Sequence, residues 1–138
     1  MKILLVVLLT VFVFSGQASG AGVPISEDSH ACIECHGTFN PGILAAWKKS
    51  RMSKVIPRAA KSVAAKERRV SFEQIPENFA NVVVGCAECH TLNPEKHKDS
   101  FEHNGYKVHV VVTPQDCATC HPVEVNQFGK NLMSEAYG

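Results

Sequence analysis

The sequence lacks an excess of charge of one sign, and it lacks a hydrophobic run long enough to cross a membrane. It has 14 Lys and Arg residues against 13 Asp and Glu residues, and without Lys2 of the N-terminal leader 13 of each sign remain. A chain without net charge does not attract a polyanion, so we expect no nucleic-acid partner. The longest apolar run, from Ile3 to Phe14, has twelve residues, fewer than the ~20 that a spanning helix needs.

Residues 1–20 predict an export signal. Lys2 supplies the positive end, the apolar run follows, and residues 15–20 are small and polar, as a cleavage site requires. A retained membrane anchor is the alternative, in which case this segment is the chain's only membrane contact. No cysteine lies near the cleavage region, which argues against a lipid anchor there. We therefore expect residues 21–138 to form one periplasmic or extracellular domain.

Cysteine is absent everywhere except in three copies of one motif. The pattern Cys-x-x-Cys-His occurs at Cys32, Cys35 and His36, at Cys86, Cys89 and His90, and at Cys117, Cys120 and His121. These copies contain all six cysteines. A histidine after all three pairs would arise by chance about once in 10⁵ at ordinary histidine frequency. The motif therefore carries the chemistry of this chain.

The motif has the spacing of haem c attachment. Two thiols add to the two vinyl groups of a porphyrin, and the adjacent imidazole binds the iron. The six cysteines are thus predicted to bind three haems covalently, with His36, His90 and His121 as proximal iron ligands. Three haems in so short a chain would lie close together, which favours electron transfer as the function.

Three other uses of the cysteines are less consistent with the sequence. Zinc could be held by two Cys-x-x-Cys pairs, but the third pair and all three histidines would have no role. A disulfide framework would not explain the histidines either. A thioredoxin-like redox pair needs one motif in a βαβ context, which is missing.

The ligand on the other side of each iron decides between an electron carrier and a catalyst, because an open position admits substrate. Six residues remain as possible distal ligands: His97, His103, Met52, Met133, His30 and His109. The two methionines occupy matching places in a weak internal repeat. Trp47 and Phe128 each precede a lysine by two residues, a methionine by five and a serine by six.

The pattern of apolar residues and prolines predicts a mostly α fold with little β structure. Helices are expected to start at Pro41 and Pro122 and to include the two methionines. A further helix with a basic outer face is predicted over 58–70, between Pro57 and Pro76, which are expected to stop helices on either side. This face is either solvated surface or a docking patch for an acidic partner. Residues 82–84 and 108–112 are expected to be extended, as separate segments or as one ribbon.

Two longer stretches suggest a family. Residues 85–105 run from Gly85-Cys86-Ala87-Glu88-Cys89-His90 through Asn93-Pro94-Glu95-Lys96-His97 to His103-Asn104-Gly105, and residues 113–124 run from Thr113-Pro114-Gln115-Asp116 through the third motif to Glu124. Together with the first motif and its tryptophan-containing helix, they resemble the hydroxylamine oxidoreductase-like multihaem cytochromes c. The resemblance covers nearly all of the mature chain.

The resemblance implies a largely helical cytochrome with closely packed haems and mostly bis-histidine iron. Family members are usually much longer and carry eight haems, so this chain matches their amino-terminal part. Many have aromatic-x-x-Ser-x-His in the two helices, with the histidine as distal ligand, where this chain has Met52 and Met133. The active haem of the enzymes lies beyond the third motif and has no counterpart here.

These observations predict an exported trihaem cytochrome c that relays electrons to and from redox partner proteins, such as other cytochromes. One alternative is a part or subunit of a hydroxylamine oxidoreductase-like enzyme acting on small nitrogen compounds. A second is a subunit of a haem-rich conductive assembly with further multihaem subunits. We do not expect this chain alone to be an enzyme, and it can be either a complete protein or a fragment of a longer one.

Overall fold

The computed structural model describes residues 22–135, so the predicted export signal lies outside the described part of the chain. In chain order the helices are α1 (Glu27–Phe39), α2 (Pro41–Lys49), α3 (Pro57–Ser62), α4 (Glu77–Ala80), α5 (Ala87–His90), α6 (Pro114–Cys117) and α7 (Pro122–Gly129), with 3-10 turns η1 (Pro94–Lys96) and η2 (Leu132–Glu135). Strands β1 (Phe101–His103) and β2 (Tyr106–Val108) form one antiparallel ribbon. About half of the described residues are helical and few are in strands, which agrees with the predicted helical class with little β structure. None of the helices in residues 22–135 is long and apolar enough to cross a membrane.

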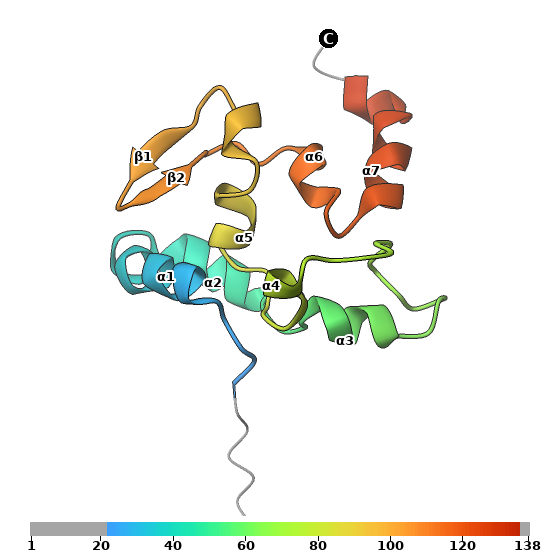
Figure 1. Ribbon diagram of the computed structural model, residues 1–138, viewed down its shortest axis with the longest axis horizontal. Coiled ribbons are helices and arrows are strands. Elements are labelled where there is room, and N and C mark those ends of the chain that lie inside the picture. The colour runs from blue at the N-terminus through green and yellow to red at the C-terminus, as the bar shows by residue number, and fades with distance from the viewer. Residues whose placement is uncertain (1–21, 136–138) are drawn as a thin grey trace, which may run out of the picture.

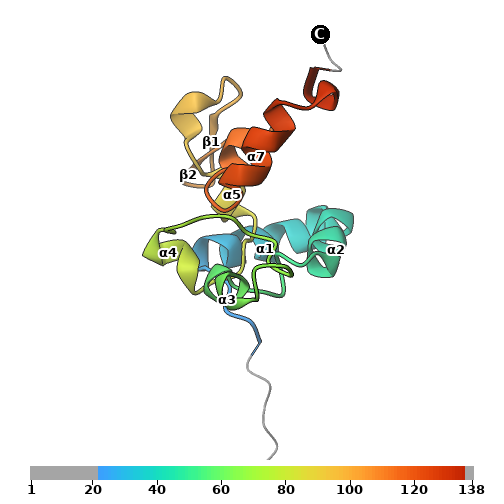
Figure 2. The same cartoon turned by 90° about the vertical axis from the view of Figure 1, so that its right-hand side faces the viewer.

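The elements form two layers with α5 between them. Helices α1 to α4 make up the lower layer in Figure 1, and the ribbon, α6 and α7 make up the upper one. The view at right angles shows the same division (Figure 2). One Cys-x-x-Cys-His motif lies in α1, the second spans α5, and the third spans the junction of α6 and α7. The motifs therefore lie in both layers and at the connection between them.

Proline starts the helices that follow the first and third motifs, as predicted. Pro41 and Pro122 both occupy the first turn, where a missing N–H has no intrahelical partner. The predicted extent was wrong, because α2 ends at Lys49 and α7 at Gly129. Met52 thus lies in a turn after α2, and Met133 lies in the separate turn η2.

The predicted helix over 58–70 is only six residues long. It ends at Ser62, whose hydroxyl donates to the Ala59 carbonyl at 2.8 Å, a local bond that competes with further helix. Val63 is already extended, with ψ 145°. Pro57 is the first residue of α3 and Pro76 is the N-cap of α4, so both prolines begin helices and do not stop them, contrary to the prediction.

The ribbon is formed by other residues than those predicted. Val108 takes part, but it pairs with Phe101, whereas residues 82–84 are not in a strand. Asn104 and Gly105 form the turn with φ of 50° and 83°, and two positive φ angles are typical of the Asn-Gly turns of tight hairpins. The ribbon carries His103 on β1 to the neighbourhood of α1.

The protein core is small. Among the described residues, the buried hydrophobic side chains are Phe72, Ala80, Val83 and Ala87. Many large apolar side chains are instead exposed, including Phe39, which is 79% accessible. A domain of this size needs more buried apolar surface than this to be stable, unless another group supplies it.

Candidate functional site

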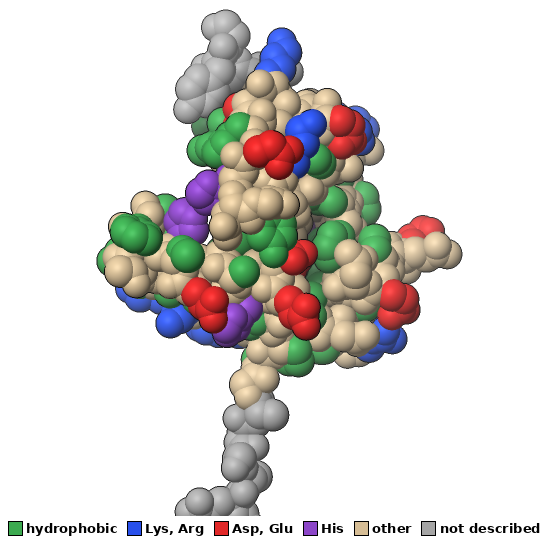
Figure 3. Space-filling model, turned by 60° about the vertical axis from the view of Figure 1, so that its left-hand side comes forward, with side chains coloured by type: hydrophobic (Ala, Val, Ile, Leu, Met, Phe, Trp, Pro, Cys, Tyr) green, Lys and Arg blue, Asp and Glu red, His purple; other side chains and the backbone are tan. Residues whose placement is uncertain are grey.

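The first motif faces a histidine of the ribbon. Cys32, Cys35 and His36 lie in α1, and the rings of His36 and His103 have centroids 6.0 Å apart at an interplanar angle of 57°. The Tyr106 hydroxyl of β2 donates to Asp28 of α1 at 3.0 Å, which holds the ribbon against that helix. On the face drawn in Figure 3, histidine side chains lie in a recess of the surface.

In the second motif, His90 is held in one orientation. Its Nδ1 contacts the carbonyl oxygen of His109 at 2.8 Å, and the N–H of His109 donates to the His90 carbonyl at 2.9 Å. A carbonyl only accepts, so Nδ1 carries the proton and Nε2 is left free to bind a metal. A metal-binding histidine is usually fixed in this way through its other ring nitrogen.

The third motif opens onto an apolar cavity. Cys117, Cys120 and His121 line it together with Cys89 of the second motif and Met52. The apolar side chains around it include Val55, Val63, Val70, Phe79, Val84 and Leu92. An apolar cavity with two thiols and one imidazole at its wall fits a porphyrin attached to those thiols.

Four of the six cysteine thiols have a raised pKa. All six thiols are free. Burial, followed by the effect of Cys117, raises the pKa of Cys89 to about 12, and burial also raises the pKa of Cys32, Cys86 and Cys120. Redox-active and zinc-binding cysteines instead need a thiolate, which a lowered pKa favours. Burial therefore disfavours the thiolate form at these four positions in the chain without a bound group.

The three motifs follow one another in space as they do in sequence. Cys32 is near enough to Cys86 for its charge to raise the pKa of Cys86 further, after burial. Cys89 is affected in the same way by Cys117 and Cys120. The second motif is thus near both others, since α1 contacts α5 and Cys89 lines the cavity of Cys117 and Cys120.

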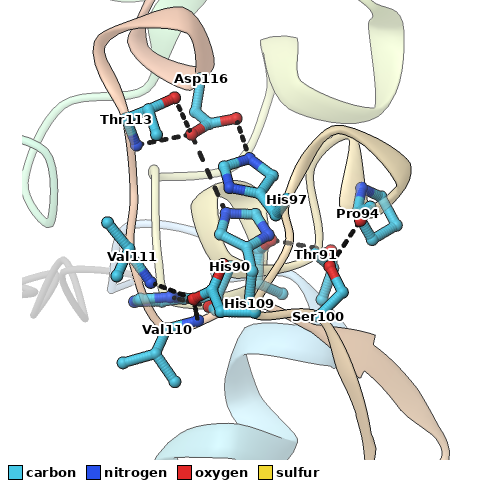
Figure 4. Close-up of polar contacts among 12 residues, drawn as sticks. His90, Thr91, Pro94, His97, Ser100, His109, Val110, Val111, Thr113 and Asp116 are labelled. Carbon is cyan, nitrogen blue, oxygen red and sulfur yellow. Dashed lines mark hydrogen bonds and ion pairs between the residues drawn. The ribbon is translucent and has the colours of Figure 1, made fainter.

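Two of the candidate distal histidines form a buried cluster with Asp116 (Figure 4). The rings of His97 and His109 stack with centroids 3.5 Å apart, and His97 Nε2 lies 3.0 Å from Asp116 Oδ1. The His109 side chain is fully buried, and neither of its ring nitrogens has a hydrogen-bond partner. Burial, then the nearby His97, lowers the pKa of His109, which favours the neutral ring, the form that can donate a lone pair to a metal.

Asp116 is a site residue that sequence reasoning missed. Its carboxylate accepts hydrogen bonds from the N–H and hydroxyl of Thr113 at 2.7 and 2.9 Å. Burial raises the pKa of Asp116, but the bonds from Thr113 and His97 outweigh it and bring the pKa below its ordinary value. Thr113-x-x-Asp116 is a capping box, a sequence signal that could have identified this residue.

The other candidate ligands differ in their surroundings. Met52 lines the cavity of the third motif and is 50% exposed. Met133 is 71% exposed on η2. The His30 side chain is 62% exposed and contacts Glu34, one turn away in α1, at 3.4 Å. The structure therefore brings Met52, His103, His97 and His109 close to the motifs or their cavity, and leaves His30 and Met133 at the surface.

The sequence from Ala31 to Val111 matches the protein family described as cytochrome c554 and c-prime. The chain belongs to this family. It is a multihaem cytochrome c, with covalently bound haem c as the cofactor of the family. The orphaned nitrogens of His109, the fixed tautomer of His90 and the cavity beside Cys117 and Cys120 all fit that group.

A solved structure described as a hypothetical multiheme protein is similar to this cytochrome. The two chains share 51% sequence identity with a TM-score of 0.73, over 75% of this chain. The match covers 20% of the other chain, so this cytochrome spans about a fifth of the length of that protein. None of the curated proteins matches the sequence.

Proposed function

We propose that this cytochrome is exported and relays electrons through three covalently bound haems, one on each motif. The observation that carries the proposal is the placement of the motifs, in which α1 contacts α5 and Cys89 of the second motif lines the same cavity as Cys117 and Cys120 of the third. Each haem would accept and release one electron at its iron. The chain's contribution is to hold the three haems close to one another and to set the ligands of each iron.

His103 is the proposed distal ligand beside His36. A metal–imidazole nitrogen bond is about 2 Å long, so two imidazoles on opposite sides of one iron have centroids roughly 6 Å apart. The separation of 6.0 Å between these two rings supports the assignment. The hairpin brings the two histidines together, because its tight turn places His103 of β1 near α1.

Met52 is the proposed distal ligand of the third haem. It lines the same cavity as His121, Cys117 and Cys120. A thioether ligand raises the potential of a haem relative to a second imidazole. The third haem is therefore expected to have the highest potential of the three.

The buried pair His97 and His109 supplies the remaining imidazole ligand. The unpartnered nitrogens of His109 support this role, since a buried polar atom without a partner is costly in free energy. His103, Met52 and the pair His97 and His109 would each offer a further ligand to one haem, which favours electron transfer over catalysis at an open iron. Other cytochromes are the expected redox partners.

A second candidate function is a part or subunit of a longer multihaem enzyme. The coverage of one fifth of the multiheme neighbour favours it, and so does the resemblance to hydroxylamine oxidoreductase-like cytochromes. In that case the haems of this chain would feed electrons to or from an active haem outside it. The same relay function is proposed for this chain under both descriptions.

Carbon monoxide binding distinguishes the relay from an enzyme. We expect the reduced protein to bind little carbon monoxide and to turn over neither hydroxylamine nor nitrite, because the chain would supply two protein ligands to each of the three irons. His103→Ala is expected to open the first iron and to give carbon monoxide binding at one haem per chain, measured in the visible spectrum.

Glu102→Ala is the matched control, because Glu102 is an exposed neighbour of His103 in β1. It is expected to behave like the unchanged protein. Stoichiometric carbon monoxide binding by the unchanged protein, together with steady-state hydroxylamine oxidation, would contradict the relay and favour the enzyme.

A further inference from the structure

A buried carboxylate connects the first two motifs. Glu88 is the third residue of the second motif, and it is only 9% exposed. Its Oε2 accepts hydrogen bonds from the Ser29 hydroxyl at 2.6 Å and from the Gly85 N–H at 2.8 Å. Its Oε1 accepts a further bond from the Ser26 hydroxyl. Ser26 and Ser29 belong to the start of α1, so Glu88 ties the helix of the first motif to the second motif.

The direction of these bonds is fixed by the backbone. The Ser29 hydroxyl oxygen accepts from the Ala87 N–H at 3.0 Å, and the Ser26 hydroxyl oxygen accepts from the Ser29 N–H at 3.2 Å. Each hydroxyl therefore uses its own proton for the bond to Glu88. Glu88 is an acceptor in all three bonds, which is the arrangement that suits an ionised carboxylate.

Gly85 leaves the space that this arrangement needs. A Cβ at this position would lie 2.4 Å from Ser29 Oγ and 3.0 Å from Glu88 Oε2. Such distances are too short for non-bonded contacts, so a side chain here would separate Ser29 from Glu88. The close approach of these three residues is therefore built into the packing of α1 against the second motif.

The first motif contains the matching residue without this environment. Glu34 is also the third residue of its motif, but its side chain is 67% exposed, and its contact is with His30 at 3.4 Å. The third motif has Thr119 at this position. A buried, hydrogen-bonded carboxyl group is thus a feature of the second motif and not of the attachment sequence as such.

We propose that Glu88 is a positioning residue that fixes the first two haems relative to each other and lowers the reduction potential of the haem on Cys86 and Cys89. The inference rests on haem attachment at these two motifs. An oxidised haem iron carries one more positive charge than a reduced one, so a nearby buried carboxylate stabilises the oxidised form. Burial keeps this interaction from being screened by water and salt, unlike that of an exposed charge.

Glu88→Gln tests the proposal, because glutamine keeps the shape of the side chain and removes its charge. In a spectroelectrochemical titration of the haem-loaded protein, we expect one component to become about tenfold easier to reduce, which is 59 mV for one electron. The melting temperature should fall as well, since the glutamine amide cannot accept all three bonds. Glu34→Gln is the matched control and should change neither value.

Glu88→Asp separates charge from position. It keeps the negative charge and shortens the side chain, so we expect a lowered melting temperature with a potential closer to that of the unchanged protein than to that of Glu88→Gln. If Glu88→Gln yields no loaded protein, Ser26→Ala serves in its place. Ser26→Ala removes one hydrogen-bond donor to the Glu88 carboxylate, so that the remaining donors stabilise its charge less. The charge then acts more strongly on the haem, and the reduction potential of one component should fall.

A failure of this proposal can be distinguished from a failure of the proposed function. Intact mass reports haem attachment in each variant, and the titration reports the charge effect. Equal potentials in Glu88→Gln and Glu34→Gln would overturn the proposal even with three haems attached. An unchanged potential in Ser26→Ala would overturn it where Glu88→Gln cannot be obtained.

Discussion

Changing both Cys117 and Cys120 to alanine is expected to lower the haem content from three per chain to two. The third porphyrin then has no covalent bond to the chain, and its cavity loses the group that fills it. The loss should reduce the free energy of unfolding by about 2–5 kcal/mol, the range found when a large buried group is removed. Iron analysis and intact mass give the count, and thermal unfolding gives the loss of stability.

Thr119→Ser is the control for this double substitution. Thr119 lies within the same motif and lines the same cavity, but both cysteines and His121 remain. This variant should retain three haems per chain. Three haems in the double alanine variant would mean that the third motif is not an attachment site.

Met52→His is expected to lower the reduction potential of one haem by on the order of 0.1 V, within the ≈0.8 V range that axial ligands span. Met52 lines the cavity of the third motif, and an imidazole favours ferric iron more than a thioether does. A redox titration should show the highest-potential component moving down toward the others.

Met133→His is the control for Met52→His. Met133 follows Phe128 as Met52 follows Trp47 in sequence, but it is 71% exposed on η2. It should leave all three potentials unchanged. A shift in Met133→His with none in Met52→His would reverse the assignment of the third distal ligand.

The sequence is most informative where covalent chemistry sets the spacing. The three attachment motifs could be predicted because a porphyrin requires two thiols and an imidazole at this spacing. The helix starts at Pro41 and Pro122 could be predicted because the first turn of a helix tolerates a residue without an N–H. The hairpin could also have been found, since Asn104-Gly105 is a strong turn signal. Its positive φ angles are what the structure shows.

Features that depend on tertiary packing were not predictable in this way. The basic segment after Pro57 has helical periodicity, yet the helix ends before Val63, whose side chain contributes to the cavity of the third motif. Glu88 reads as an ordinary motif residue in the sequence, identical in position to Glu34. Only the packing of α1 against the second motif buries one and exposes the other.

Tertiary packing also limits what the internal repeat predicts about the iron ligands. Met52 and Met133 have equivalent registers in the sequence, but they have different neighbours, since one follows α2 into a cavity and the other lies on an exposed turn. The ligand of an iron is set by elements that are distant in sequence, as with His103 of the ribbon and His36 of α1. Local patterns cannot fix such pairs.

The intact mass of the exported protein after denaturation in acid tests the central claim most directly. The account predicts a chain that begins near Ala21 and carries three covalently bound haems, with the colour remaining on the protein. A mass without haem, with zinc or disulfides in its place, would contradict the account.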